Sequence, residues 1–73
     1  MKEVLLMEIK IRNDYITLGQ FLKLTDFIQS GGEAKAALQE LEITVNGVVE
    51  NRRGRKLYSG DQVVIEGHAF LIQ

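Results

Sequence analysis

Hydrophobic and polar positions follow two different periods along the chain, and these periods predict where strands and helices lie. Residues 3–12 contain a short apolar run followed by the alternation Ile9-Lys10-Ile11-Arg12, which is typical of a strand with one buried face. Asn13-Asp14-Tyr15 interrupts that strand. From residue 18 apolar side chains recur every three or four positions, which predicts a helix from about Leu18 to Gln29. Its expected buried stripe consists of Leu18, Phe21, Leu22, Thr25 and Ile28.

Two helix starts carry the signature of a capping box, in which a hydroxyl and a carboxyl or amide three positions later satisfy free backbone amides. Thr17 with Gln20 marks the start of the first helix, and Ser30 with Glu33 marks a second helix that is expected to run to about Glu42. Small side chains on the second helix would let the two helices pack closely. Its apolar stripe is Ala34, Ala37, Leu38 and Leu41.

The remainder of the chain reads as short strands joined by tight turns. Asn46-Gly47 lies between β-branched residues, which is a strong signal for a hairpin because both turn positions need a positive φ. Residues 59–61 and 67–68 predict further turns, with strands at 62–66 and 69–72. We therefore expect a single α+β domain over residues 1–73, in which a helix pair is followed by short β-hairpins packed as a small, mainly antiparallel sheet.

Composition excludes several classes of site. The chain has no cysteine and one histidine, His68, so neither a disulfide framework nor the usual zinc ligand sets are expected. No serine, cysteine or carboxylate is spaced around His68 as in a catalytic triad, so we expect no catalytic residues, no cofactor, no small-molecule substrate and no enzymatic activity. The apolar residues 4–7 are bracketed by Glu3 and Glu8 and are too few to span a membrane. We expect a cytoplasmic protein.

The distribution of charge is more informative than its sum. Nine basic and ten acidic residues give a net charge of −1, which by itself argues against a nucleic-acid-binding protein. However, the chain between Glu50 and Asp61 holds no acid, and this segment includes a basic loop expected at 51–57. Guanidinium groups bind phosphate oxygens through paired hydrogen bonds, and Gly54 would let a sugar-phosphate backbone approach. The predicted phosphate-binding residues are Arg52, Arg53, Arg55 and Lys56. A solvated surface loop is the alternative.

Further residues could extend this basic surface. Lys23 and Lys35 lie on the polar faces of the two predicted helices, although each could equally be a solubilising lysine. Gly31 and Gly32 would leave free amides at the start of the second helix, where anions bind, or could serve helix-turn-helix geometry alone. Tyr58 follows the basic loop and could stack on an unpaired base or pack against the protein.

These residues make the chain resemble a known family, the RNA-binding domain named after small-ribosomal-subunit protein S-four. The signature of this family is a helix pair followed by a hairpin, which is called the αL motif. The resemblance covers residues 18–67. Residues 18–24, 30–35 and 52–57 resemble, more specifically, the free-standing bacterial YaaA/YbcJ group within this family. The segments that carry the family resemblance are Phe21-Leu22-Lys23-Leu24, Ser30, Glu33-Ala34-Lys35, Val45-Asn46-Gly47, Gly60-Asp61 and Val63-Val64-Ile65.

This resemblance implies binding of structured RNA, ribosomal or transfer, by the helix-pair face and the adjoining loop, and for the free-standing group a part in ribosome assembly or maturation. Many family members carry arginine before the first helix and at the start of the second, where this chain has Thr17 and Gly31-Gly32. The difference shifts the expected contacts toward the loop arginines. A protein-interaction adapter whose basic loop docks an acidic partner is the alternative function.

Overall fold

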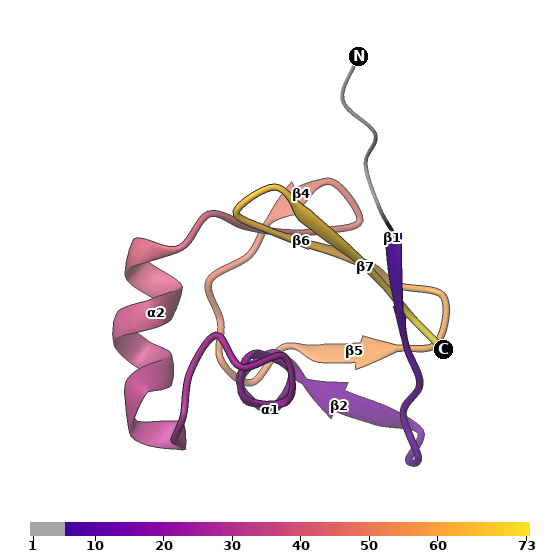
Figure 1. Cartoon of the computed structure of the whole chain (residues 1–73), viewed down its shortest axis with the longest axis horizontal. Coiled ribbons are helices and arrows are strands. Elements are labelled where there is room, and N and C mark those ends of the chain that lie inside the picture. The colour runs from indigo at the N-terminus through magenta and orange to yellow at the C-terminus, as the bar shows by residue number, and fades with distance from the viewer. Residues whose placement is uncertain (1–5) are drawn as a thin grey trace.

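A five-stranded sheet and two helices make up most of the fold, which the computed structural model describes for residues 6–73 (Figure 1). The strands of this sheet stand in the order β1-β7-β6-β3-β4. β1 runs parallel to β7, and the other neighbours pair antiparallel. The α+β class is therefore confirmed, and the sheet is mixed. The five strands are β1 Leu6–Ile9, β3 Ile43–Val45, β4 Val48–Val49, β6 Gln62–Ile65 and β7 His68–Ile72.

A second, two-stranded sheet was not predicted. β2 (Tyr15–Thr17) pairs antiparallel with β5 (Lys56–Tyr58), although Tyr15 was expected in a break and Lys56 in a loop. Side chains alternate across this ribbon, so Ile16 and Leu57 point toward the core while Tyr15 and Tyr58 face outward. The ribbon ties the segment before the first helix to the segment after the basic loop.

The first helix, α1 (Leu18–Leu24), begins as predicted and ends earlier than predicted. The Thr17 hydroxyl accepts from the Gln20 amide at 3.2 Å, and the Gln20 side chain accepts from the Thr17 amide at 3.0 Å, so the capping box is confirmed. The helix stops because Asp26 takes a left-handed conformation with φ of 64°. The amides of Asp26 and Phe27 then bond back to helix carbonyls, a Schellman motif that closes the helix.

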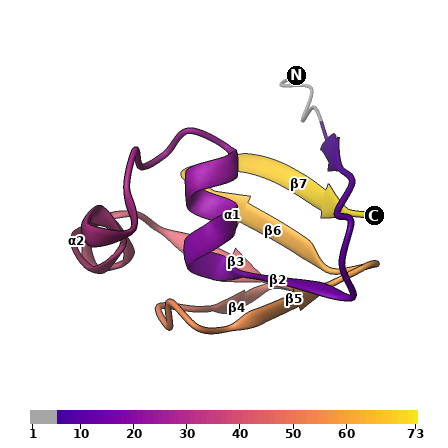
Figure 2. The ribbon, with the colours of Figure 1, turned by 90° about the horizontal axis from the view of Figure 1, so that it is seen from below.

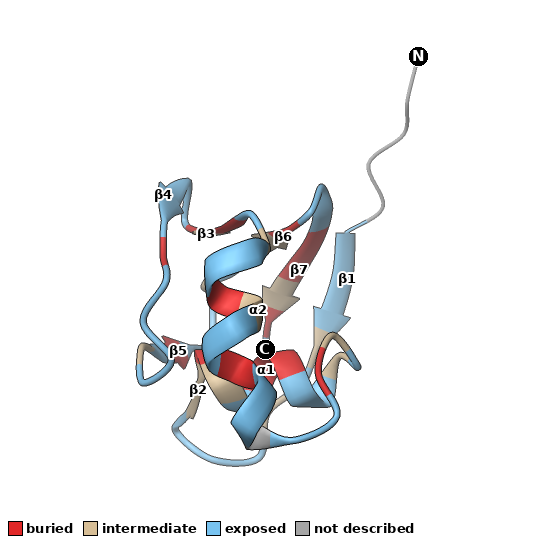
Figure 3. Cartoon of the chain, turned by 90° about the vertical axis from the view of Figure 1, so that its left-hand side faces the viewer, coloured by how far each residue is buried: buried red, intermediate tan, exposed pale blue. Residues whose placement is uncertain are grey.

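The second helix is also shorter than predicted, and its predicted cap is wrong. Gly31–Glu33 forms a 3-10 turn, η1, and α2 spans Ala34–Glu40. The Glu33 carboxylate accepts from the Gln29 amide at 3.3 Å, and α2 has no side-chain cap. The predicted stripe is nevertheless correct, because Ala34 and Leu38 are buried and Ala37 and Leu41 pack against the core. Figure 3 shows α2 on the surface, with most of its residues exposed.

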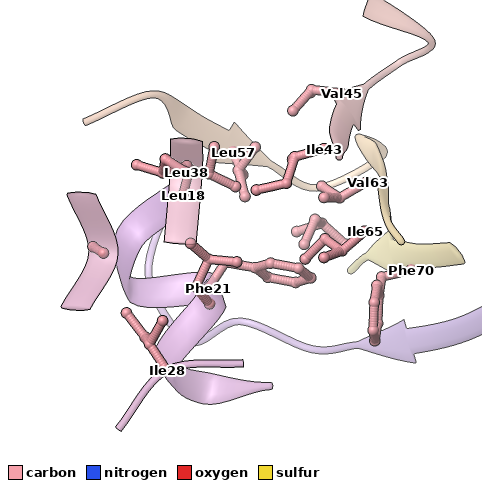
Figure 4. Packing of buried hydrophobic residues seen from close by; sticks show 13 residues of the cluster. Leu18, Phe21, Ile28, Leu38, Ile43, Val45, Leu57, Val63, Ile65 and Phe70 are labelled. Carbon is pink, nitrogen blue, oxygen red and sulfur yellow. The ribbon is translucent and has the colours of Figure 1, made fainter. Parts of the chain in front are cut away.

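The hydrophobic core lies between α1 and one face of the sheet (Figure 2). Phe21 points from α1 toward the sheet, where its ring meets Phe70 edge to face with centroids 5.3 Å apart (Figure 4). Ile28, past the end of α1, is buried as the helical period predicted, although its segment is not helical. The fully buried side chains of largest volume are Phe21, Leu18, Leu22, Ile43, Leu57, Ile65, Ile72, Val45 and Val63.

The β3–β4 turn and the edge strand β1 agree with the sequence prediction in part. Asn46 and Gly47 have φ of 52° and 84°, which confirms the predicted hairpin between β3 and β4. β1 covers only part of the predicted strand, whose residues 3–5 lie outside the described part of the chain. Its Leu6 and Met7 are exposed, whereas Ile9 in β1 and Ile11 just after it both pack against the core, as the predicted alternation requires. Within residues 6–73, no helix is long and apolar enough to cross a membrane.

Candidate nucleic-acid interface

The basic loop is organised around one buried carboxylate, Glu50, which corrects the expectation that its arginines are unpaired. Arg52 Nε lies 3.0 Å from one Glu50 carboxylate oxygen, and Arg55 Nη1 lies 2.9 Å from the other. The amides of Asn51 and Arg52 also donate to this carboxylate, at 3.2 and 3.1 Å. Two of the four predicted phosphate ligands therefore already bind an anion. Glu50 stands just before the basic run, so a search for acids on both sides of the run would have found it.

The ionisation of Glu50 follows from these contacts. Hydrogen bonds from the Arg52 side chain are the main cause that lowers the pKa of Glu50 to about 2, and they outweigh burial, which raises it. The same pair raises the pKa of Arg52. Glu50 is thus a carboxylate at neutral pH, and its side chain is only 8% exposed. The buried charge is compensated by two guanidinium groups and by backbone amides.

The loop is fixed to the start of α1 by its own carbonyl groups. The Leu18 amide donates to the Arg55 carbonyl at 2.8 Å, and the Gly19 amide donates to the Arg53 carbonyl at 2.9 Å. These amides have no partner within α1, because they belong to its first turn. A side chain at position 19 would collide with the loop, since a Cβ there would lie 2.7 Å from Arg53 Cγ. Gly19, which the sequence analysis did not single out, thus lets the loop pack on the helix.

Arg53 stands at the centre of a basic surface to which three elements contribute. It lines a shallow hollow with Lys23 of α1 and a second hollow with Lys35 of α2. Among residues 6–73, no acidic residue lines either hollow, and no carboxylate lies within 4.0 Å of these three cations. We call Lys23, Lys35 and Arg53 the Arg53 surface. Figure 3 shows the chain from β4 to β5, which carries the loop, running beside α2.

Lys56 and Tyr58 are placed elsewhere, on the outer face of the β2–β5 ribbon. The Lys56 ammonium lies 4.8 Å from the centre of the Tyr15 ring, a cation–π contact. The rings of Tyr15 and Tyr58 are 5.9 Å apart and tilted by 50°. Both tyrosines are more than 40% exposed. The structure therefore brings these residues together with Tyr15, which the sequence analysis did not include, rather than with the Arg53 surface.

The two glycines before α2 do not lie at the helix start where the anion site was predicted. Gly31 and Gly32 lie in the 3-10 turn, and the first residue of α2 is Ala34. Glu33 places a carboxylate between the turn and the helix. Gly32 lines neither hollow of the Arg53 surface. The arrangement therefore favours side chains of α1, α2 and the loop as the contacts for a polyanion.

Comparison with known proteins places the chain in a family. A family model described as "S4 domain" matches residues 9–73. "Probable ribosome maturation protein RlbA" of Bacillus subtilis is 64% identical over 59 residues, covering 81% of this chain and 83% of that protein. "Putative RNA-binding protein YbcJ" of Escherichia coli is 34% identical over 58 residues, covering 80% of this chain and 83% of that protein. The chain belongs to the S4 domain family.

Proposed function

We propose that this chain is a non-catalytic module that binds structured RNA through the Arg53 surface and acts in ribosome maturation. The observation that carries the proposal is the convergence of Lys23, Lys35 and Arg53, from two helices and a loop, on a surface lined by no acidic residue. Membership of the S4 domain family and the names of two relatives, one for ribosome maturation and one for RNA binding, support it.

The mode of binding follows from the chemistry of the three cations. Ammonium and guanidinium groups contact phosphate oxygens, which position an RNA helix but do not read its sequence. Arg53 is held by its own carbonyl, which accepts from the Gly19 amide, so its side chain starts from a fixed backbone. Two cations start from helix backbones and one from an anchored loop, so all three can reach the phosphates of one structured RNA.

The other predicted residues take different parts in this proposal. Arg52 and Arg55 bind Glu50 and thereby shape the loop, and the exposed side chain of Arg52 leaves it able to make a weaker contact. Lys56 and Tyr58 lie apart from the Arg53 surface, on the β2–β5 ribbon, and Gly31 and Gly32 lie in the turn before α2. We propose ribosomal RNA within an assembling particle as the target, with transfer RNA as the other structured candidate, and hence a cytoplasmic site of action.

Co-sedimentation with ribosomal subunits tests this function. The chain is mixed with purified subunits, with and without prior ribonuclease treatment, and the pellet is assayed for the protein. We expect the chain to pellet with intact subunits and to remain in the supernatant after digestion. A variant in which Lys23, Lys35 and Arg53 are all replaced by alanine should stay in the supernatant in both cases. Retention on the RNA-depleted ribosomal proteins would instead support the adapter that docks an acidic protein.

A further inference from the structure

A hollow of the described surface lies beside the Arg53 surface, between the segment that joins β1 to β2 and one side of α1. Its volume is about 620 Å³, within the range of sites that hold small ligands. Ile11 and Ile16, both partly buried, supply apolar lining, and Leu24 is 55% exposed beside them. The outward ring of Tyr15 also lines this hollow and is 41% exposed. The hollow therefore combines apolar surface with an accessible aromatic ring.

The charged and polar residues around the hollow fit a nucleotide. Lys10, Arg12 and Lys23 line it. In the described part of the chain no acidic residue lines it, and no carboxylate pairs with these cations within 4.0 Å. The amides of Asn13 and Gln20 each offer hydrogen-bond donors and an acceptor, as the edge of a base requires. An adjoining smaller hollow, which Arg12 and Tyr15 also line, includes Asp14.

The hollow is continuous with the Arg53 surface. Lys23 and Gln20 line both this hollow and the hollow that contains Arg53. An RNA held at Arg53 would therefore bring its neighbouring nucleotides to Tyr15. Unpaired bases are recognised by stacking on aromatic side chains and by hydrogen bonds to their edges, which a paired base inside a duplex does not offer.

From this arrangement we propose that the hollow binds a single unpaired nucleotide of the RNA, with its base against Tyr15 and its phosphate near Lys10, Arg12 or Lys23. The proposal rests on the proposed function, because the Arg53 surface holds the adjoining helix. It adds a preference: the chain selects RNA in which an unpaired nucleotide interrupts or adjoins a duplex.

Two RNA hairpins of the same stem test the proposal, one with a single bulged 2-aminopurine and one fully paired. The parent should bind the bulged RNA more tightly, and the 2-aminopurine fluorescence should fall as the base stacks. Tyr15→Ala should lose about 5- to 100-fold in affinity for the bulged RNA, the loss expected for one stacked base. Tyr15→Phe should retain the preference and the fluorescence change, because it keeps the ring.

Further arms separate the possible outcomes. Arg12→Ala removes an exposed side chain and should weaken binding of the bulged hairpin only. Circular dichroism should show that Tyr15→Ala, Tyr15→Phe and Arg12→Ala all fold. Equal binding of the two hairpins by the parent would overturn the nucleotide site and leave the proposed function intact. Failure of the parent to bind either hairpin would overturn both. The 2-aminopurine ribonucleoside monophosphate alone should bind far more weakly than the bulged hairpin, and equal affinity would overturn the assignment to RNA.

Discussion

Replacing Glu50 by glutamine tests how the basic loop is built, because glutamine keeps the size of the side chain and removes its charge. In the folded chain the pKa of Glu50 is lowered from 4.5 to about 2, mainly by hydrogen bonds from Arg52. A pKa difference of that size corresponds to at most about 3–4 kcal/mol of stability, since a tenfold change in proton affinity is worth about 1.4 kcal/mol. Arg52 is 72% exposed, so water screens the pair and we expect about 1–2 kcal/mol.

The sign of the pH dependence follows from the lowered pKa. A group that binds protons less well in the folded chain stabilises the fold above its unfolded pKa and loses that effect as the pH falls. The stabilisation by Glu50 should therefore be complete above pH 4.5 and decline toward pH 2. The parent and Glu50→Gln should differ by about 1–2 kcal/mol at pH 7 and converge in acid.

Urea denaturation followed by circular dichroism, at several pH values between 7 and 2.5, measures this difference. Glu40→Gln is the matched control, because Glu40 is exposed on α2 and makes no ion pair within the described residues. The control should stay within about 0.5 kcal/mol of the parent at neutral pH. A stability difference between the parent and Glu50→Gln that is absent at pH 7, or that does not shrink in acid, would refute the reasoning.

Two further predictions concern the core and the junction of loop and helix. Phe21→Ala should cost about 3–5 kcal/mol, because the ring is fully buried against Phe70. A thermal melt should show a large loss, and a midpoint within a few degrees of the parent would show that Phe21 is not a core anchor. Gly19→Ala should displace the Arg53 side chain, since the new Cβ would lie 2.7 Å from its Cγ. RNA affinity should then fall while circular dichroism stays unchanged, and parent-like affinity would exclude a positioning role for Gly19.

Local signals in the sequence predicted the local parts of the fold. The Thr17 capping box and the Asn46-Gly47 hairpin formed as expected, because the interacting groups lie within a few residues of one another. The end of α1 was missed, since Asp26 takes a positive φ that the helical period does not reveal. Aspartate can adopt a left-handed backbone conformation, and Phe27 can follow it at the end of a helix. Many helices contain an aspartate followed by an apolar residue without ending there, so this dipeptide alone does not predict the helix end.

Contacts between distant segments could not be read from the sequence. β2 and β5 are three residues each, and Tyr15 pairs with Tyr58 across more than half of the chain, so neither strand carries a strong periodic signal. The composition of the basic surface was likewise predicted only in part. Arg53 does share one hollow with Lys23 and another with Lys35, whereas the pairing of Glu50 depends on how the loop folds.

The salt dependence of RNA binding by Arg53→Ala tests the central claim most directly. Each phosphate contact releases counterions, so three contacts give a slope of log K against log salt of about −2 to −3. For a fully paired hairpin, Arg53→Ala should flatten that slope by about 0.7–0.9 and weaken binding regardless of sequence. Arg52→Ala, which removes the same charge from the same loop, should change the slope by less than half as much, because Arg52 already binds Glu50. An unchanged slope and affinity in folded Arg53→Ala, or an equal effect of Arg52→Ala, would contradict the account.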